Sequence, residues 1–374
     1  MRDVLRFVLR VAIVLFVLCC IAELAALAGL VDYRTLIGPS HGWKFRSVAD
    51  PELGSIRRPH THKKGSALGG NDAAAFNTPA SDLTLFHWDV KYDHNGFRNN
   101  TDLQQADIVI IGDSMVEGMT ASDSELLTSQ LAQLQGKVVA NLGQGGYGPL
   151  EEIVVLRRYA LPLHSHTIIW MFCEANDLQD VLAYHRALDH PPDFLHAFWM
   201  RSFTRSAGLT IQRLLSPPVK PPGEKHSGLC PLPDGKAVRV YFGYPAQALS
   251  PEELGAFEET IRTIATAYQL SSAQGTQLVF VFVPSKYRVL HALCQFPEDS
   301  VCRDWVLPDL STRFQAALQS VSPRIGYLDL TPSLVEAAKT QGLPYYRDDE
   351  HWSPEGHKVV AQVINQYLSA TGTR

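Results

Sequence analysis

Four short polar clusters hold the residues of this 374-residue chain that could do chemistry together. The first contains Asp113 and Ser114, the second is a glycine-rich run at 141–148, the third contains Asn176, and the fourth is Asp-Asp-Glu-His at 348–351. A serine hydroxyl is a weak nucleophile that needs a base within hydrogen-bond reach and a third group that orients the base. The clusters supply all of these residue types, so they indicate acyl transfer through an activated serine.

Each side chain suits one role in that reaction. We expect Ser114 to be the nucleophile and His351 its general base, with one of the aspartates just before the histidine holding the second ring nitrogen. An oxyanion hole needs fixed donors that point at the developing charge. The backbone N–H of Ser114, the backbone N–H of a glycine in the run at 141–148 and the side-chain amide of Asn176 suit that task.

Short apolar runs that alternate with helical segments must position these clusters. We expect five strands, at 107–111, 137–141, 167–173, 276–283 and 325–330. Runs that are apolar on both faces indicate a parallel sheet between two helical layers. The fold class is therefore α/β, a three-layer flavodoxin-like sandwich with a five-stranded parallel sheet. Ligands of such sheets bind at the carboxyl ends of the strands, where three of the clusters begin.

The predicted helices between these strands have clear start signals. Capping boxes at 122–125 and 250–253 open two of them, which are expected to reach about residues 135 and 273. Further helices are expected at 149–159 and 308–320, and from residues 331 and 353 onward. The three expected parts of the chain are a membrane anchor at 1–31, an extracytoplasmic tether with a leading strand at 32–106, and a catalytic domain at 107–374. Residues 178–249 break the rhythm and are interpreted as an insertion.

An apolar stretch at 11–31 carries one charge and is long enough to span a bilayer as a helix. Arg2, Arg6 and Arg10 precede it, so the positive-inside rule puts the N-terminus in the cytoplasm and the rest outside. We expect an uncleaved anchor in the inner (cytoplasmic) membrane and a periplasmic or extracellular catalytic domain. The alternative is a signal peptide cleaved after the A-x-A run at 26–28.

Net charge and missing motifs argue against several classes of partner and cofactor. The formal net charge of −5 offers no basic excess for nucleic acid. The chain has no C-x-x-C or H-E-x-x-H motif and no dinucleotide fingerprint, so neither a metal nor an organic cofactor is expected. In an oxidising compartment Cys294 and Cys302, which are close in sequence, could pair and leave Cys230 odd, although spacing alone does not fix pairing.

The four clusters resemble the motif blocks of the SGNH/GDSL hydrolase superfamily. Gly-Asp-Ser at 112–114 matches its nucleophile block. The asparagine-led run at 141–148 matches its second block, and Gly146 falls at the position of the family's oxyanion glycine. Asn176 matches the third block, although Glu174 replaces the usual glycine there. The resemblance covers about residues 107–370, apart from the insertion.

The fourth block fits this family in two ways. Asp348 lies three residues before His351, as in the D-x-x-H block of the wider superfamily, and this favours Asp348 as the orienting carboxylate. The ending Asp-Glu-His-Trp at 349–352 also resembles membrane-anchored bacterial members that occur beside polysaccharide O-acyl transfer systems. In those members the spacing points to Asp349, so both aspartates stay candidates.

The resemblance implies a membrane-anchored serine esterase that acts on O-acyl esters, acetyl esters above all, through an acyl-enzyme. Two alternatives remain open: an O-acyltransferase that modifies a cell-surface polysaccharide, and a non-catalytic carbohydrate-binding subunit with the same fold. The expected partners are an O-acylated carbohydrate or another ester, the membrane, and an integral-membrane acyltransferase.

Overall fold

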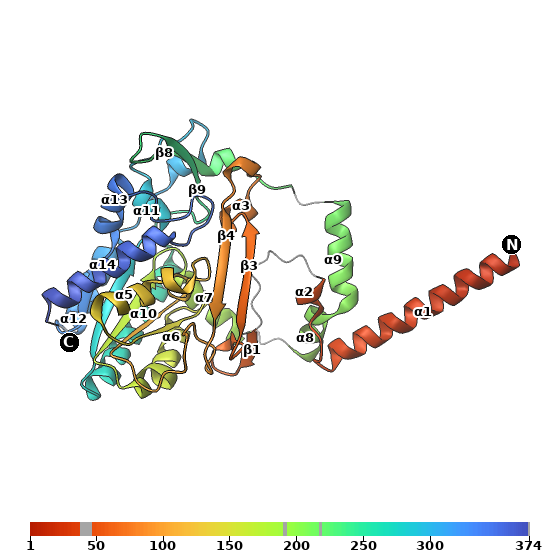
Figure 1. Ribbon diagram of the computed structural model, residues 1–374, viewed down its shortest axis with the longest axis horizontal. Helices are drawn as coiled ribbons and strands as arrows, with labels where there is room; N and C mark the ends of the chain where they lie inside the picture. Colours follow the sequence, from red (N-terminus) through yellow and green to blue (C-terminus); the bar gives the residue numbers. More distant parts are fainter. Residues whose placement is uncertain (38–46, 190–192, 217–218, 373–374) are drawn as a thin grey trace. The chain divides into compact units, whose positions relative to one another are not determined.

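The computed structural model describes residues 1–37, 47–189, 193–216 and 219–372. The chain forms two compact units, and it passes between them three times. We call the first the anchor unit, which consists of Met1–Lys44 and Arg186–Val219. The second, the sheet unit, consists of Phe45–His185 and Lys220–Arg374. Figure 1 labels many of the elements of both.

The sheet unit is built on a five-stranded parallel sheet with the strand order β11-β10-β7-β5-β6. The strands are β5 (Ile108–Gly112), β6 (Val139–Gly143), β7 (Thr167–Cys173), β10 (Gln277–Val283) and β11 (Gly326–Asp329). All five lie where the sequence predicts them. Every residue of β5 and β7 is buried, because both faces of the sheet are covered. The order, with the second strand at one edge, is that of a flavodoxin-like sheet.

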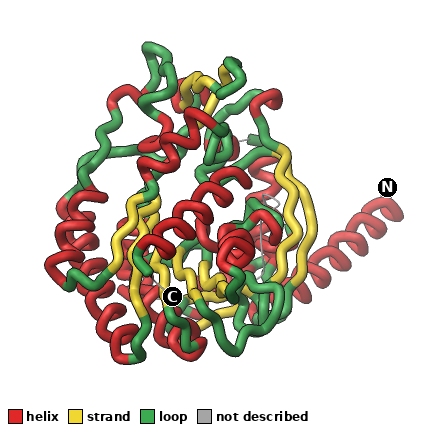
Figure 2. The backbone as a smooth tube through the Cα atoms, turned by 60° about the vertical axis from the view of Figure 1, so that its left-hand side comes forward, coloured by secondary structure: helices red, strands yellow, loops and turns green. Residues whose placement is uncertain are grey.

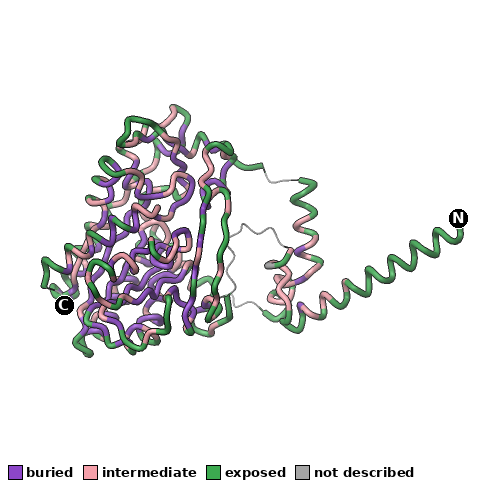
Figure 3. Tube along the Cα trace, viewed as in Figure 1, coloured by how far each residue is buried: buried purple, intermediate pink, exposed green. Residues whose placement is uncertain are grey.

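Helices cover both faces of this sheet, as Figure 2 shows. One apolar core packs alternate strand residues against α5 (Leu127–Gln135), α13 (Thr331–Thr340) and α14 (Pro354–Ala370). The other core packs the opposite strand residues against four helices. They are α6 (Pro149–Val155), α7 (Asp177–Asp189), α10 (Pro251–Ala273) and α12 (Leu310–Val321). The buried residues in Figure 3 are concentrated between these layers, which confirms the predicted three-layer α/β/α sandwich.

One predicted helix begins later than its start signal. The capping box at 122–125 is present, but it closes a single 3-10 turn, Asp123–Glu125. Leu126 then adopts an extended conformation, with φ −61° and ψ 143°, and α5 begins only at Leu127. The side chain of Leu126 is buried, so packing against the core separates the capping box from the helix that it was expected to open.

The segment before the sheet is not the irregular tether that the sequence suggested. Two antiparallel hairpins lie there, β1 (Ser47–Asp50) with β2 (Gly54–Arg57), and β3 (His62–Leu68) with β4 (Leu85–Lys91). The predicted leading strand is β4. The side chains of β3 are mostly exposed, which explains why its sequence reads as polar and irregular. The short helix α3 (Asn71–Ala75) lies in the connection between β3 and β4.

The predicted insertion divides between the two units. Its first residues lie in α7, and its last ones include the hairpin of β8 (Ser227–Pro231) and β9 (Ala237–Tyr241) in the sheet unit. Its middle part contributes α8 (Phe194–Arg201) and α9 (Phe203–Leu215) to the anchor unit. Residues 178–249 therefore do not form a single inserted element, because they are divided between the two units.

The cysteine pairing that spacing suggested is wrong. A disulfide joins Cys230 to Cys294, whereas Cys302 is a free, buried thiol. The reason lies in the hairpin. Leu229 and Gln295 form an antiparallel bridge, which brings the two disulfide cysteines together across 64 residues of sequence.

The anchor unit begins with α1 (Arg2–Leu27), a 26-residue helix that is long and apolar enough to cross a membrane. The short helix α2 (Tyr33–Leu36) follows it. The remaining short helices are in the sheet unit: α4 (Ser114–Glu117), α11 (Lys286–Leu290), and helical turns at Ala80–Asp82, Leu156–Ala160, Leu161–Leu163, Gly223–His226 and Val301–Asp304.

Candidate active site

Ser114 and His351 lie within hydrogen-bond distance at the carboxyl end of the sheet. Ser114 is the first residue of α4, directly after β5, and Asp113 caps that helix by accepting the Met115 N–H at 2.9 Å. The Ser114 Oγ lies 2.8 Å from the Nε2 of His351. Residues 237 positions apart in sequence are therefore within hydrogen-bond distance, as a serine nucleophile and its base would have to be.

A closed loop at 345–352 presents the histidine. Tyr345 and Trp352 form an antiparallel bridge at its base, and the Tyr346 N–H donates to the His351 carbonyl at 3.1 Å. The Trp352 side chain is fully buried in the core beside the sheet. The loop is thus fixed at both ends, and the imidazole is held at the rim of the sheet.

The two candidate aspartates have different partners. Asp349 Oδ1 lies 2.5 Å from the Nδ1 of His351. Asp348 instead accepts the Thr84 N–H at 2.8 Å, the Thr84 hydroxyl, and the Gly70 N–H at 3.3 Å. The preference for Asp348 that came from the wider family pattern is therefore corrected to Asp349. The physical reason is that the side chain of Asp348 is directed toward the β3–β4 segment, where backbone donors satisfy it.

Charge at the site favours an ion pair between the loop carboxylate and the ring. Burial disfavours the charged forms of both groups, but their mutual attraction outweighs it. As a result, the pKa of Asp349 is lowered, and that of His351 is raised to about 9. The N–H groups of Asn71, at 2.7 Å, and of His351 also donate to the Asp349 carboxylate. Asp349 is thus held ionised, as a group that stabilises an imidazolium must be.

Lys286 holds the loop at 345–352 through a hydrogen bond to its backbone, and the sequence analysis did not predict this role. Its fully buried ammonium donates to Asp72 at 2.5 Å and to the carbonyl of Asp349 at 3.0 Å, and it lies 3.6 Å from Glu350. Burial lowers the pKa of Lys286, but the carboxylates around it raise the pKa above its usual value. Lys286 comes three residues after β10, so extending the strand-end rule to the fourth strand would have found it.

The glycine-rich run lies on the other side of Ser114. Gly146 has a positive φ of +85°, a conformation that favours glycine. The preceding N–H, of Gly145, donates at 2.6 Å to Glu117, a buried carboxylate that also binds the guanidinium of Arg57 at 2.7 Å. Within the part of the chain that the structure describes, no acceptor takes the backbone N–H of Ser114 or Gly146. Both N–H groups are therefore free to donate to a ligand, and the neighbouring Gly145 lies close to Ser114.

Asn176 is close to the nucleophile, but its amide is occupied. Its Nδ2 donates to Asp113 at 3.1 Å and to Asp180 at 2.6 Å. An amide has two N–H groups, so neither is left for an oxyanion in this arrangement. Burial, with the nearby charge of Asp113 as a lesser cause, raises the pKa of Asp180 to about 6. The expected third oxyanion donor becomes available only if one of these bonds is exchanged.

Glu174, which stands where the family usually has glycine, has a structural partner. Its carboxylate binds the guanidinium of Arg288 and accepts the N–H of Ser285 at 3.0 Å and its hydroxyl at 3.1 Å. Glu174 therefore ties the end of β7 to the turn after β10. Glutamate in place of glycine at position 174 therefore leaves the carboxyl end of the sheet intact.

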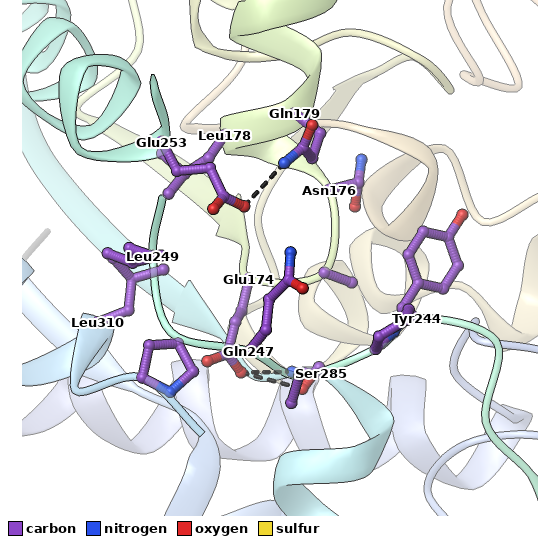
Figure 4. Close-up of a pocket in the computed structure, with 14 residues that line it drawn as sticks. Glu174, Asn176, Leu178, Gln179, Tyr244, Gln247, Leu249, Glu253, Ser285 and Leu310 are labelled. Carbon is purple, nitrogen blue, oxygen red and sulfur yellow. Dashed lines mark hydrogen bonds between the residues drawn. The ribbon is translucent and has the colours of Figure 1, made fainter. Parts of the chain in front are cut away.

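A cavity of about 380 Å³ opens beside Asn176. Figure 4 shows that amide, carboxylate, hydroxyl and aromatic groups line it. The Gln179 amide donates to Glu253 at 2.7 Å on one wall, and the partly exposed ring of Tyr244 lies on another. Apolar side chains, among them Leu178, Leu249 and Leu310, line the rest of it, so the cavity offers both polar and apolar contacts to a ligand. Among the described residues, no group of three or more His, Cys, Asp or Glu side chains could hold a metal ion.

Comparison with known proteins finds one family model that matches the C-terminal part of the chain. Residues 244–374 match a family described as SGNH hydrolase-like domain, acetyltransferase AlgX. This range contains the loop with Asp349 and His351. The resemblance to the SGNH/GDSL superfamily is thereby confirmed. None of the curated proteins matches the chain.

Several solved structures are also similar. A GDSL-like lipase from Bacteroides thetaiotaomicron is 12% identical, with a TM-score of 0.35. The match covers 71% of this chain and 88% of that one. A variant of Axe2, an acetyl-xylooligosaccharide esterase from Geobacillus stearmophilus, is 12% identical, with a TM-score of 0.37 and coverages of 73% and 97%. LAE5, an alpha/beta hydrolase enzyme from the metagenome of Lake Arreo, is 13% identical, with a TM-score of 0.38 and coverages of 73% and 97%. Identities and TM-scores this low carry no argument about function.

Proposed function

We propose that this chain, with its SGNH hydrolase-like domain, is a membrane-anchored serine enzyme that cleaves O-acyl esters through an acyl-enzyme. One observation carries the proposal: Ser114 Oγ, the His351 ring and the Asp349 carboxylate form a continuous hydrogen-bonded chain, with separations of 2.8 and 2.5 Å. Three side chains in this order are what a serine nucleophile requires.

The chemistry follows from the geometry. Ser114 Oγ attacks the acyl carbonyl carbon while His351 Nε2 takes the hydroxyl proton, and Asp349 stabilises the resulting imidazolium. When the C–O bond to the alcohol breaks, His351 returns the proton to the leaving oxygen and the acyl group stays on Ser114. A second hydroxyl, from water or from a sugar, then attacks the acyl carbonyl carbon while His351 takes its proton. The bond to Ser114 Oγ breaks, and His351 returns the proton to that oxygen.

The oxyanion of each tetrahedral intermediate would lie beside the N–H groups of Ser114 and Gly146. Both groups are available in the structure, and fixed donors of this kind stabilise developing charge strongly. Asn176 would become the third donor when the substrate oxygen replaces Asp113 or Asp180 as its partner. That exchange would couple substrate binding to completion of the site.

The acceptor decides between esterase and acyltransferase. The family description names an acetyltransferase, and the cavity beside Asn176, which has both polar and apolar walls, could hold an acylated sugar chain as donor or acceptor. We therefore keep O-acyl transfer to a cell-surface polysaccharide as the second candidate, with an integral-membrane acyltransferase as the source of acyl groups. Incubation with an acetyl donor and an oligosaccharide separates the two: free acetate alone indicates hydrolysis, and acetylated oligosaccharide indicates transfer.

We propose that the sheet unit lies outside the cytoplasm, in the periplasm or the extracellular space. The apolar helix α1 and the arginines before it support an anchor with this orientation. The disulfide between Cys230 and Cys294 supports an oxidising compartment.

The decisive test removes the nucleophile. Ser114→Ala should abolish release of p-nitrophenol from its acetate ester without a change in melting temperature, whereas Ser124→Ala, at an exposed serine nearby, should keep full activity. A fluorophosphonate probe should label the wild type at Ser114 only. Unchanged turnover in Ser114→Ala would refute Ser114 as the nucleophile, whereas a wild type that resists the probe would support the non-catalytic carbohydrate-binding subunit.

A further inference from the structure

Two helices of the anchor unit leave large apolar side chains uncovered. In α9, Leu214 and Leu215 are 78% and 79% exposed, and Ile211 is also exposed. In α8, Leu195 and Trp199 are exposed in the same way, and so is Phe194. Exposed apolar patches of this kind mark surfaces that contact another protein or a membrane.

These side chains form stripes rather than a scatter. Ile211, Leu214 and Leu215 have the spacing i, i+3, i+4, and Leu195 and Trp199 the spacing i, i+4, so each set lies on one face of its helix. The described segment 193–216 carries three arginines and a single aspartate, although the chain as a whole has a net charge of −5. Apolar stripes with basic residues beside them are typical of helices that lie in a membrane interface.

The same two helices are bound to α1, the apolar helix. One carboxylate oxygen of Glu23 accepts the Ser202 hydroxyl at 2.9 Å, the Thr204 N–H at 2.7 Å and the Thr204 hydroxyl. The Cys19 thiol lies 3.7 Å from the same Thr204 hydroxyl. The junction of α8 and α9 is therefore fixed to the side of α1.

Contacts beyond the end of α1 extend this attachment. The rings of Tyr33 and Phe203 pack edge to face, 5.2 Å apart, and the Thr210 hydroxyl donates to the Ile37 carbonyl at 2.6 Å. The α9 helix is thus held along its length by the segment that follows α1. These contacts fix where α8 and α9 lie relative to the helix that enters the bilayer.

The position of Glu23 sets the depth. Glu23 and Cys19 precede the last residue of α1 by four and eight positions, which is about 6 and 12 Å along the helix axis. If the roughly 20 residues of α1 that end at Leu27 span the hydrocarbon layer of about 30 Å, Glu23 lies inside its outer half. An acid at that depth is costly unless it is hydrogen-bonded, and Ser202 and Thr204 supply the donors.

We propose that α8 and α9 form an interfacial lipid-binding element, which lies in the outer leaflet of the bilayer that α1 spans, with its apolar stripes against acyl chains. This inference rests on the proposed membrane anchor, but not on the proposed chemistry. Lipid is the occupant because the element is packed against the spanning helix and its arginines complement anionic headgroups. Trp199 has the side-chain type that is enriched at the membrane interface. The protein is thus attached to the membrane by more than one helix.

The test measures lipid contact in the full chain. Single-cysteine variants are made with Cys19→Ser and Cys20→Ser, because Cys173 and Cys302 are buried and should not react. An environment-sensitive nitrobenzoxadiazole probe is attached after Leu195→Cys or Leu214→Cys. Two controls are Ile13→Cys in α1 and Val306→Cys, an exposed apolar position of the sheet unit. The proteins are reconstituted in phosphatidylethanolamine–phosphatidylglycerol vesicles with and without nitroxide-labelled lipid.

We expect nitroxide lipid to quench the probes at 195 and 214 by at least about twofold, as it quenches the probe at 13, and to leave the probe at 306 unchanged. Quenching at 13 but not at 195 or 214 would overturn the interfacial element and leave the anchor standing. A blue-shifted but unquenched probe at 214 would show that a second copy or another protein covers the stripe, which also overturns it. Absence of quenching at 13 would refute the anchor itself, and with it this inference, without bearing on Ser114.

Discussion

The two sides of the candidate nucleophile differ in how complete they are. On the acid–base side, Asp349 and His351 already have all the partners that the reaction needs, and donors from residues 70–84 and from Lys286 hold the loop in place. On the oxyanion side, the backbone donors are available, but the amide of Asn176 is bound to two carboxylates. The base is therefore preorganised, whereas one oxyanion donor is still engaged elsewhere.

This difference shows where binding energy would be used. A preorganised base requires no rearrangement when substrate binds, so substitutions there should lower the rate directly. A donor that must exchange partners makes catalysis depend on the substrate that displaces them. The following predictions test whether the two sides really differ in this way.

The largest effect is expected at the loop carboxylate. Asp349→Asn keeps the shape but leaves the imidazolium without a counter-charge and favours the wrong tautomer, so kcat for an acetyl ester should fall by about 10⁴-fold. Asp348→Asn should leave kcat within about tenfold and instead lower the stability by about 2 kcal/mol, because Asp348 binds Thr84 rather than His351. The opposite ranking of the two variants in kcat would show that Asp348 is the orienting residue.

The next effect is expected on the oxyanion side. Asn176→Ala should lower kcat by about 10²–10³-fold if the amide reaches the oxyanion during the reaction. If its bonds to Asp113 and Asp180 persist throughout, the variant should lose stability while kcat changes little. Steady-state kinetics and thermal unfolding of the same preparation separate these two outcomes.

The pH dependence should reflect the raised pKa of His351. Only the neutral ring can accept the proton of Ser114, and the pKa of about 9 means that the neutral form increases as the pH rises through that value. The kcat/KM of the wild type should therefore increase by roughly 50-fold from pH 7 to pH 9. Asp349→Asn should move this limb to lower pH. A limb near pH 6.5 in the wild type would contradict the ion pair.

A smaller effect is expected at a residue that touches no substrate. A methyl group on Gly70 would lie 2.4 Å from the Cβ of Asp349, so Gly70→Ala must displace the loop. We expect a loss of about tenfold in kcat with little change in KM. Gly255→Ala in α10, where the added methyl group meets nothing within 4 Å, is the matched control and should be neutral or slightly stabilising. Equal activity of both variants would indicate that the loop is not tightly held.

Much of the sheet could be predicted because its signals are local. The strands β7 and β10 are uninterrupted apolar runs, and α10 begins at a proline after a capping serine, so each was placed within a residue or two of its bounds. The hairpin strand β3 gave no such signal, since its side chains face solvent and read as polar. A buried strand requires apolar residues and can therefore be recognised in the sequence, whereas an exposed hairpin has no such requirement.

The site residues likewise fall into those that local sequence signals predict and those that depend on contacts between distant segments. Ser114 and His351 could be proposed from the residues that follow strands, because parallel strands bring their ends together. The choice between Asp348 and Asp349 could not be made, since it depends on which carboxylate faces the segment with Thr84 and Gly70. The disulfide partner of Cys230 was likewise set by a bridge between distant segments rather than by spacing.

The hydrogen bonds from Thr84 and Gly70 to Asp348 have a consequence for how the protein is made. They connect residues 264 and 278 positions apart, so the early hairpin leaves the ribosome long before its carboxylate partner is synthesised. Contacts of such long sequence separation form late in folding. If the chain is exported from its N-terminus, the proposed site could assemble only after the loop with Asp349 and His351 has crossed the membrane.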